Sequence, residues 1–224
     1  MNSIMETVRD VCNNVRQSGK HGISFQNLLT KLRKEFRDHG FDLKIKSNRS
    51  KKLNHEEFYV NAYYDAEDDQ NKEIPIEVVV HHNFNKETIW DYKHITDFLI
   101  QIFDAVVHEY KHQRQSRKRL HILYWDHIDS ASCYHSYLSD PDELDAYAFS
   151  IAVELCRTLG KYRALRYLHT ISSLAKLKFS GQFVSPNLSA YVGQFGDVSN
   201  PLIKRLAKKV YVRLQKIDTD VIFV

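Results

Sequence analysis

The pattern His-Glu-x-x-His at residues 108–112 constrains this chain more than any other feature of its sequence. Apolar residues recur every three or four positions from Ile95 to Tyr110, which predicts an amphipathic helix with His108 and His112 on its flank. Side chains four positions apart on a helix have Cβ atoms roughly 5–6 Å apart, so both imidazoles can reach one tetrahedral zinc ion. Glu109 would lie beside that ion, placed to take a proton from a water whose pKa the zinc lowers to about 7. The alternative is that the histidines belong to a solvated or packed helix face.

A second predicted helix runs from Pro141 to Leu159 and supplies a candidate third ligand. Asp140 is its expected cap, proline occupies the first helical position, and Gly160 ends it. Glu143 lies in the first turn of this helix, where a carboxylate projects from a fixed backbone. The alternative role of Glu143 is to complete a capping box and to complement the helix dipole.

Taken together, the two helices resemble the gluzincin-like zinc metallopeptidases, and in particular the small peptidases of the ImmA/IrrE type. In that group a Glu on a downstream helix completes the zinc site, within a segment of the form Glu-Ala-Asn/Asp-x-Phe-Ala. The corresponding segment of this chain reads Glu-Leu-Asp-Ala-Tyr-Ala, from Glu143 to Ala148. Asp145 matches the polar residue and Tyr147 the aromatic one, whereas Leu144 departs from the usual Ala.

The resemblance covers about residues 95–155 and implies a complete zinc centre. It implies that His108, His112 and Glu143 hold Zn²⁺, that Glu109 is the catalytic base, and that the substrate is a polypeptide. A peptidase also needs a group that stabilises the developing oxyanion. Three residues upstream of the second helix are candidates for this role or for substrate contact, and core or loop packing is the alternative for each: Tyr134, His135 and Tyr137.

The expected fold class is α+β and zincin-like. A small antiparallel sheet is predicted to precede the helix with the histidines, the helix with the third ligand and further C-terminal helices. We expect a single domain over 1–224, with N-terminal helices in 1–40, the sheet in 41–82, metal-site helices in 88–160 and a C-terminal helical part in 161–224.

Periodicity and turn residues place the individual elements of this fold. The predicted helices outside the candidate site cover 5–15, 25–36, 162–178 and 201–217, and the predicted strands cover 41–46, 58–64 and 73–81. An acidic hairpin loop is expected at 65–71, and an irregular or short-helical region at 120–140. Residues 77–82 read either as an edge strand, along which a peptide can align, or as a central core strand.

Composition excludes several classes of protein. Of 224 residues, 43% are apolar and 27% are charged, which are ordinary globular values. The chain has no run of the roughly 20 apolar residues that a membrane span needs and no signal-peptide pattern, so we expect a cytoplasmic protein when it is synthesised. The three cysteines are widely spaced, which favours reduced thiols over a disulfide framework.

Three functions remain open at this point. The first is a zinc-dependent peptidase or amide hydrolase. The second is a non-catalytic zincin-like structural or interaction protein that assembles with other chains, for example in a phage particle, because small chains of this style resemble phage-encoded proteins. The third and weakest is a nucleic-acid-binding protein that uses the basic residues at 114–119 and 204–213. The net charge of +4 is modest and solvated basic faces are common, so we expect nucleic acid to be an unlikely partner.

Overall fold

The computed structural model describes residues 1–54, 56–85, 87–120, 134–173, 184–195 and 199–224. The fold is α+β, as predicted. The chain divides into two compact units: unit 1 comprises Met1–Ile122 with Phe223–Val224, and unit 2 comprises Leu123–Ile222. The sequence predicts a single domain over 1–224. Two compact units can belong to one domain, so the single domain stays a prediction. Across the described ranges, no helix combines the length and apolar character that crossing a membrane requires.

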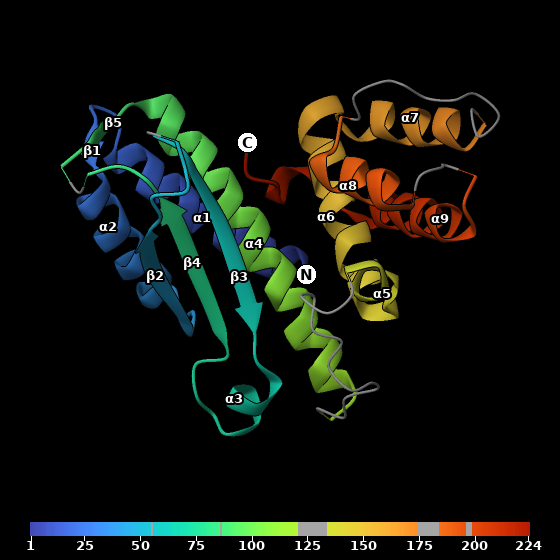
Figure 1. The fold of residues 1–224 in the computed structure, drawn as a ribbon, viewed down its shortest axis with the longest axis horizontal. Coiled ribbons are helices and arrows are strands. Elements are labelled where there is room, and N and C mark those ends of the chain that lie inside the picture. The colour runs from blue at the N-terminus through green and yellow to red at the C-terminus, as the bar shows by residue number, and fades with distance from the viewer. Residues whose placement is uncertain (55, 86, 121–133, 174–183, 196–198) are drawn as a thin grey trace. The chain divides into compact units, whose positions relative to one another are not determined.

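Unit 1 is a layer of helices on one face of a small sheet (Figure 1). Its elements are α1 (Asn2–Ser18), β1 (Ile23–Ser24), α2 (Phe25–Asp38), β2 (Leu43–Arg49), β3 (Phe58–Tyr64), α3 (Ala66–Gln70), β4 (Ile76–His82), β5 (Ile89–Trp90) and α4 (Tyr92–Lys118). The long helix α4 packs on β3, β4 and α1, while α2 packs on β2 and α1. The core therefore lies between α2 and α4 and the sheet, and continues between these two helices and α1.

The main sheet is mixed, so the prediction of an antiparallel sheet is wrong for one of its two strand pairs. The strand order is β2-β4-β3, with β4 parallel to β2 and antiparallel to β3. The strand β4 carries the buried Ile76, Val78 and Val80. A strand with such an apolar face is buried best in the centre of a sheet, where it has a neighbouring strand on each side. Residues 77–82 therefore belong to the central strand, and the edge-strand interpretation of this segment is wrong.

The helix ends in unit 1 follow the capping chemistry of the sequence. Ser24 caps α2 as predicted, because its Oγ accepts a hydrogen bond of 3.3 Å from the backbone N–H of Asn27. Asp91 caps α4, accepting from the backbone N–H of His94 at 2.8 Å. The helix α4 thus begins three residues before Ile95, where the apolar periodicity starts.

In its described residues, unit 2 contains helices joined by short turns and no strand. Its elements are α5 (Tyr134–Ser139), α6 (Pro141–Leu159), α7 (Lys161–Ser173), α8 (Pro186–Phe195), α9 (Pro201–Lys216) and a 3-10 turn (Thr219–Val221). The helix α6 has the predicted bounds and packs against α5, α7, α8 and α9, which accounts for its almost continuous burial from Ala146 to Cys156. Most of the irregular region expected at 120–140, namely 121–133, lies outside the described residues, as does the predicted helix beyond Ser173.

The helix α8 was not predicted, and a buried carboxylate holds its start. Glu154 of α6 accepts hydrogen bonds from the Oγ of Ser185, and from the backbone N–H and the Nδ2 of Asn187 at 3.3 and 2.6 Å. Ser185 in turn accepts from the backbone N–H of Leu188 at 3.1 Å. A buried charge requires such partners, so Glu154 and the first turn of α8 stabilise each other.

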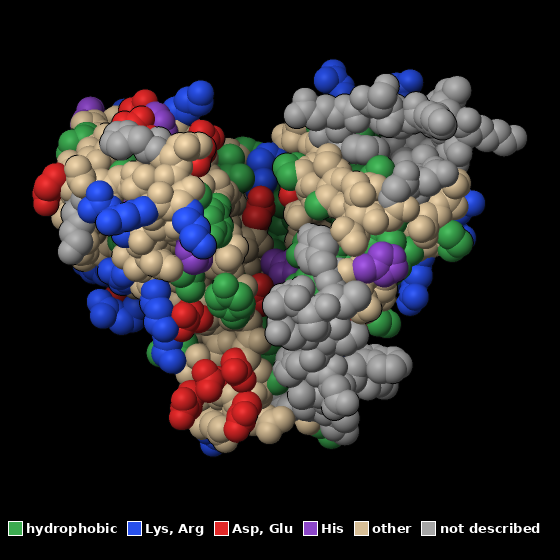
Figure 2. All heavy atoms as spheres, viewed as in Figure 1, with side chains coloured by type: hydrophobic (Ala, Val, Ile, Leu, Met, Phe, Trp, Pro, Cys, Tyr) green, Lys and Arg blue, Asp and Glu red, His purple; other side chains and the backbone are tan. Residues whose placement is uncertain are grey.

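A buried aspartate joins the hairpin between β3 and β4 to α4. Figure 2 shows acidic side chains gathered at α3, which lies in this hairpin. Most are exposed, but the side chain of Asp69 is only 4% exposed. It accepts hydrogen bonds from Arg117 at 2.7 and 2.9 Å, from Gln113 at 3.0 Å and from the hydroxyl of Tyr64 at 3.0 Å. The predicted hairpin loop is therefore a short helix attached to the C-terminal turns of α4.

The surroundings of Asp69 determine how its carboxyl group titrates. Burial acts to raise the pKa of Asp69, but the hydrogen bonds from Arg117, Tyr64 and Gln113 outweigh burial and lower it. A carboxylate whose pKa is lower in the folded than in the unfolded chain stabilises the fold above the unfolded value of about 3.9. That stabilisation is lost as the pH falls through the lower, folded pKa.

We predict that Asp69→Asn lowers the free energy of unfolding at pH 7 by about 1–3 kcal/mol, because the buried charge-assisted hydrogen bonds are weakened. Urea unfolding curves measure the change. The difference between wild type and variant should stay constant from neutral pH down to about pH 5 and shrink below about pH 4. Glu67→Gln, which removes the same charge from an exposed position of α3, is the matched control. Equal effects of the two substitutions would contradict the role of Asp69.

Candidate metal centre

The apolar stripe of α4 fixes which way its two histidines face. Ile95, Phe98, Leu99, Ile102, Phe103 and Val106 are all fully buried. Since 3.6 residues make one turn, residues four apart differ by about 40° around the axis, so His108 and His112 share one flank of the helix. Both side chains are half-buried there. Packing of the apolar stripe thus holds the pair at the border of the core, as predicted.

The two imidazoles have the spacing of ligands of one ion. The Nε2 atoms of His108 and His112 are 3.1 Å apart, and the ring centroids are 4.8 Å apart at an interplanar angle of 66°. Two nitrogens that each lie about 2.0–2.1 Å from a tetrahedral zinc ion are about 3.3 Å from each other. The same distance also suits an N–H···N hydrogen bond between the rings. The spacing is therefore compatible both with a shared metal ion and with a hydrogen bond between the two rings.

Glu109, the predicted catalytic base, is buried, with 8% of its surface exposed. It follows His108 directly and lies about 60° around the helix axis from His112. A carboxylate in such a place is unusual in a helix whose other buried residues are mostly apolar. Its position between the apolar stripe and the histidine flank distinguishes Glu109 from the exposed acidic residues of unit 1.

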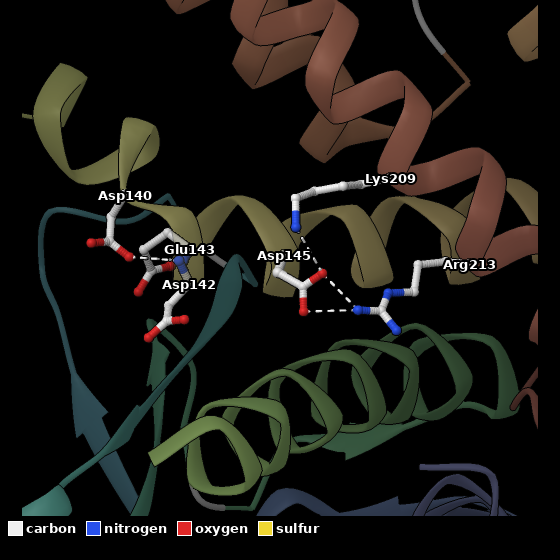
Figure 3. A network of polar contacts seen from close by, with 6 residues as sticks. All are labelled: Asp140, Asp142, Glu143, Asp145, Lys209 and Arg213. Atoms are coloured by element: carbon white, nitrogen blue, oxygen red, sulfur yellow. Dashed lines mark hydrogen bonds and ion pairs between the residues drawn. The ribbon is translucent and has the colours of Figure 1, made fainter. Parts of the chain in front are cut away.

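In unit 2, Glu143 lies where the sequence predicts, in the first turn of α6 (Figure 3). Asp140 caps this helix, because its Oδ1 accepts from the backbone N–H groups of Asp142 at 2.7 Å and of Glu143 at 3.3 Å. Pro141 occupies the first helical position, as predicted. The cap therefore fixes the backbone from which the Glu143 side chain extends.

Among the three candidates for oxyanion or substrate contact, the structure brings Tyr137 to Glu143. Burial, then the charge of Glu143, and hydrogen bonds with Glu143 and Tyr147 raise the pKa of Tyr137. Its hydroxyl is therefore protonated at neutral pH and can donate a hydrogen bond. His135 is exposed and packs on Phe195, with ring centroids 4.5 Å apart. Tyr134 begins α5, and its side chain lies outside the described part of the structure.

An ion-pair network on α6 was missed by the sequence analysis (Figure 3). Asp145 accepts from Arg213 at 2.6 and 2.8 Å and from Lys209 at 3.2 Å, which attaches α6 to α9 two residues after Glu143. The basic residues at 204–213, which include both cations, are predicted from the sequence to form a solvated face. The available signal was their spacing of four residues, which puts two cations on one side of α9.

His108, His112 and Glu143 each offer one atom that can ligate a metal ion: a ring nitrogen from each histidine and a carboxylate oxygen from Glu143. The histidines belong to unit 1 and Glu143 belongs to unit 2. Comparisons with protein-family models, with curated proteins and with solved structures found no match.

We predict that Asp145→Asn lowers the free energy of unfolding by about 1–2 kcal/mol, because two cations then face each other without a carboxylate. A double-mutant cycle with Arg213→Gln, followed by thermal or urea unfolding, measures the coupling. We expect a coupling energy of at least about 0.5 kcal/mol between the two positions. Strictly additive effects would show that this ion pair does not hold α9 to α6.

Proposed function

We propose that this protein is a zinc-dependent peptidase or amide hydrolase with a zincin-like core of the gluzincin type. In this proposal His108, His112 and Glu143 bind one Zn²⁺, and Glu109 is the catalytic base. The observation that carries the proposal is the 3.1 Å separation of the two Nε2 atoms within a His-Glu-x-x-His helix. That separation is close to the roughly 3.3 Å expected between two nitrogen ligands of one tetrahedral zinc ion.

The donor set itself favours a catalytic over a structural metal site. Two imidazoles and one carboxylate leave the fourth tetrahedral position open for water or substrate, whereas structural zinc sites are usually closed by four protein ligands. Glu143 suits the third position because it matches the ligand of the segment that this chain resembles and because Asp140 fixes its backbone. In that arrangement Tyr137 is the residue that orients the Glu143 carboxylate.

In this proposal each residue of the site has a separate chemical role. A bound zinc ion supplies Lewis acidity at a substrate carbonyl and makes water more acidic. Glu109 accepts the proton from the attacking water and passes it to the leaving amine, which is general base and then general acid catalysis by one carboxylate. Tyr137 donates its single hydroxyl proton to Glu143, so its role in this scheme is to hold the third ligand rather than to contact the oxyanion. The substrate class that fits these steps is a polypeptide or another amide.

We predict about one tightly bound zinc ion per chain in protein purified without chelators, and its loss in His108→Ala, because removing one of three ligands weakens binding steeply. Elemental analysis by plasma mass spectrometry measures the metal content. His94→Ala is the matched control, since His94 is an exposed histidine of the same helix. Freshly prepared wild-type protein without any bound divalent metal would refute the proposed site.

We predict that Glu109→Gln keeps the zinc content of the wild type but lowers the rate of amide hydrolysis by about 10²–10⁴-fold, because the proton acceptor is lost. Cleavage of a mixed peptide library, followed by mass spectrometry, measures the activity without assuming a sequence preference. Wild-type activity should disappear with a zinc chelator and return when zinc is added. Cleavage by Glu109→Gln at the wild-type rate would show that Glu109 is not the base.

A further inference from the structure

Within the described residues of unit 1, no helix packs on one of the two faces of the main sheet. The helices α2 and α4 pack on the face that includes Val78 and Val80, with α1 packed on both helices, and Figure 1 shows the strands in front of them. We call the opposite side the open face. Its residues alternate with the buried ones along each strand, and they are Lys44, Lys46, Asn48, Tyr59, Asn61, Tyr63, Glu77, Val79 and His81.

The strand register arranges these residues in three rows across the sheet. Lys44, Glu77 and Tyr63 form one row, Lys46, Val79 and Asn61 the next, and Asn48, His81 and Tyr59 the third. Cations therefore follow one edge of the open face, on β2, and tyrosines follow the other, on β3. Since neighbouring strands lie about 4.7–4.9 Å apart, the two columns are separated by about 10 Å.

The tyrosine column presents flat aromatic surface to solvent. Tyr59 and Tyr63 are 41% and 55% exposed. Tyr59 stacks on His81 with ring centroids 4.5 Å apart and an interplanar angle of only 9°. Because the two tyrosines are four residues apart on one strand, their rings stand about 13 Å apart along the sheet. Exposed, oriented rings of this kind are platforms on which further planar groups can stack.

The basic column continues into the turn after β2. Residues 44–52 contain five Lys or Arg and no Asp or Glu, and all five cations are exposed: Lys44, Lys46, Arg49, Lys51 and Lys52. Lys46 pairs at 2.6 Å with Glu77, which neutralises the acidic residue of the open face. Figure 2 shows the Lys and Arg side chains along this side of unit 1 and hydrophobic ones over β3.

We propose that the open face binds single-stranded nucleic acid, with phosphates along β2 and unpaired bases stacked on Tyr59 and Tyr63. A positively charged track beside aromatic rings is the combination by which proteins hold single strands without sequence preference. An acidic protein segment would match the cations but gives the tyrosine rings no planar partner. A duplex conceals its base faces, so it cannot use the tyrosine column either. This inference is independent of the zinc site.

Fluorescence anisotropy with a labelled oligothymidylate of about 20 nucleotides tests the proposal, using the full chain at low salt with a chelator present. We expect saturable binding by the wild type. The double variant Tyr59→Ala/Tyr63→Ala should bind about 5- to 150-fold more weakly for each base that loses its platform. Tyr59→Phe/Tyr63→Phe keeps both aromatic faces and should bind as the wild type does.

A charge-matched pair of variants separates the open face from the general charge of the protein. Lys44→Gln/Lys51→Gln should weaken binding and lower the slope of log affinity against log salt by about 0.7 for each phosphate that the variant no longer neutralises. Lys204→Gln/Lys208→Gln removes the same charge from exposed positions of α9 and should leave binding unchanged. Thermal unfolding of all variants confirms that they are folded.

Four results would overturn the proposal. The first is the absence of saturable binding by the wild type, and the second is wild-type affinity in folded Tyr59→Ala/Tyr63→Ala. The third is an equal loss of affinity in the β2 and α9 charge variants. The fourth is displacement of the oligonucleotide by polyglutamate or duplex DNA as effectively as by unlabelled single strand. The last result would identify an acidic protein or a duplex as the partner of the cations.

Discussion

Burial of the apolar stripe of α4 is the interaction on which the rest of unit 1 depends. This helix has 27 residues and packs on the sheet and on α1 at once, so its rotation about its own axis is fixed by side chains such as Phe98 and Ile102. A shift of one residue would turn the helix by about 100° and bring His108 to the place of a core side chain. The hydrophobic core and the position of the histidine pair are therefore determined by the same packing.

Those parts of the fold that depend on neighbours along the chain were predictable. The helices α4 and α6 follow from apolar periodicity, and the caps by Ser24 and Asp140 from the short reach of their side chains. The central position of β4 depends instead on which strands pair across the sheet, and alternation alone does not distinguish parallel from antiparallel neighbours. The helix α8 escaped prediction because Glu154, which holds its start, comes about thirty residues earlier.

The same distinction applies to the candidate site. The spacing of His108 and His112 is a local property of one helix, and the structure confirms that their ring nitrogens meet. Tyr134, His135 and Tyr137 were equivalent candidates in the sequence, because their roles depend on how α5 meets α6. Only the fold of unit 2 shows that Tyr137 contacts Glu143. Likewise, Asp145 and Arg213 are far apart in sequence, so the charges alone could not reveal their pairing.

The anchor between Asp69 and the end of α4 has a consequence for motion. The last turns of a long helix ordinarily fray, since their carbonyl groups lack partners within the helix. Here Gln113, which follows His112 directly, and Arg117, one turn further on, are bound to a carboxylate in the hairpin between β3 and β4. Local opening of the helix end must therefore break hydrogen bonds to the hairpin as well, so the two segments open as one cooperative unit. The histidine pair thus stands next to a helix end whose opening is opposed by its hydrogen bonds to the hairpin.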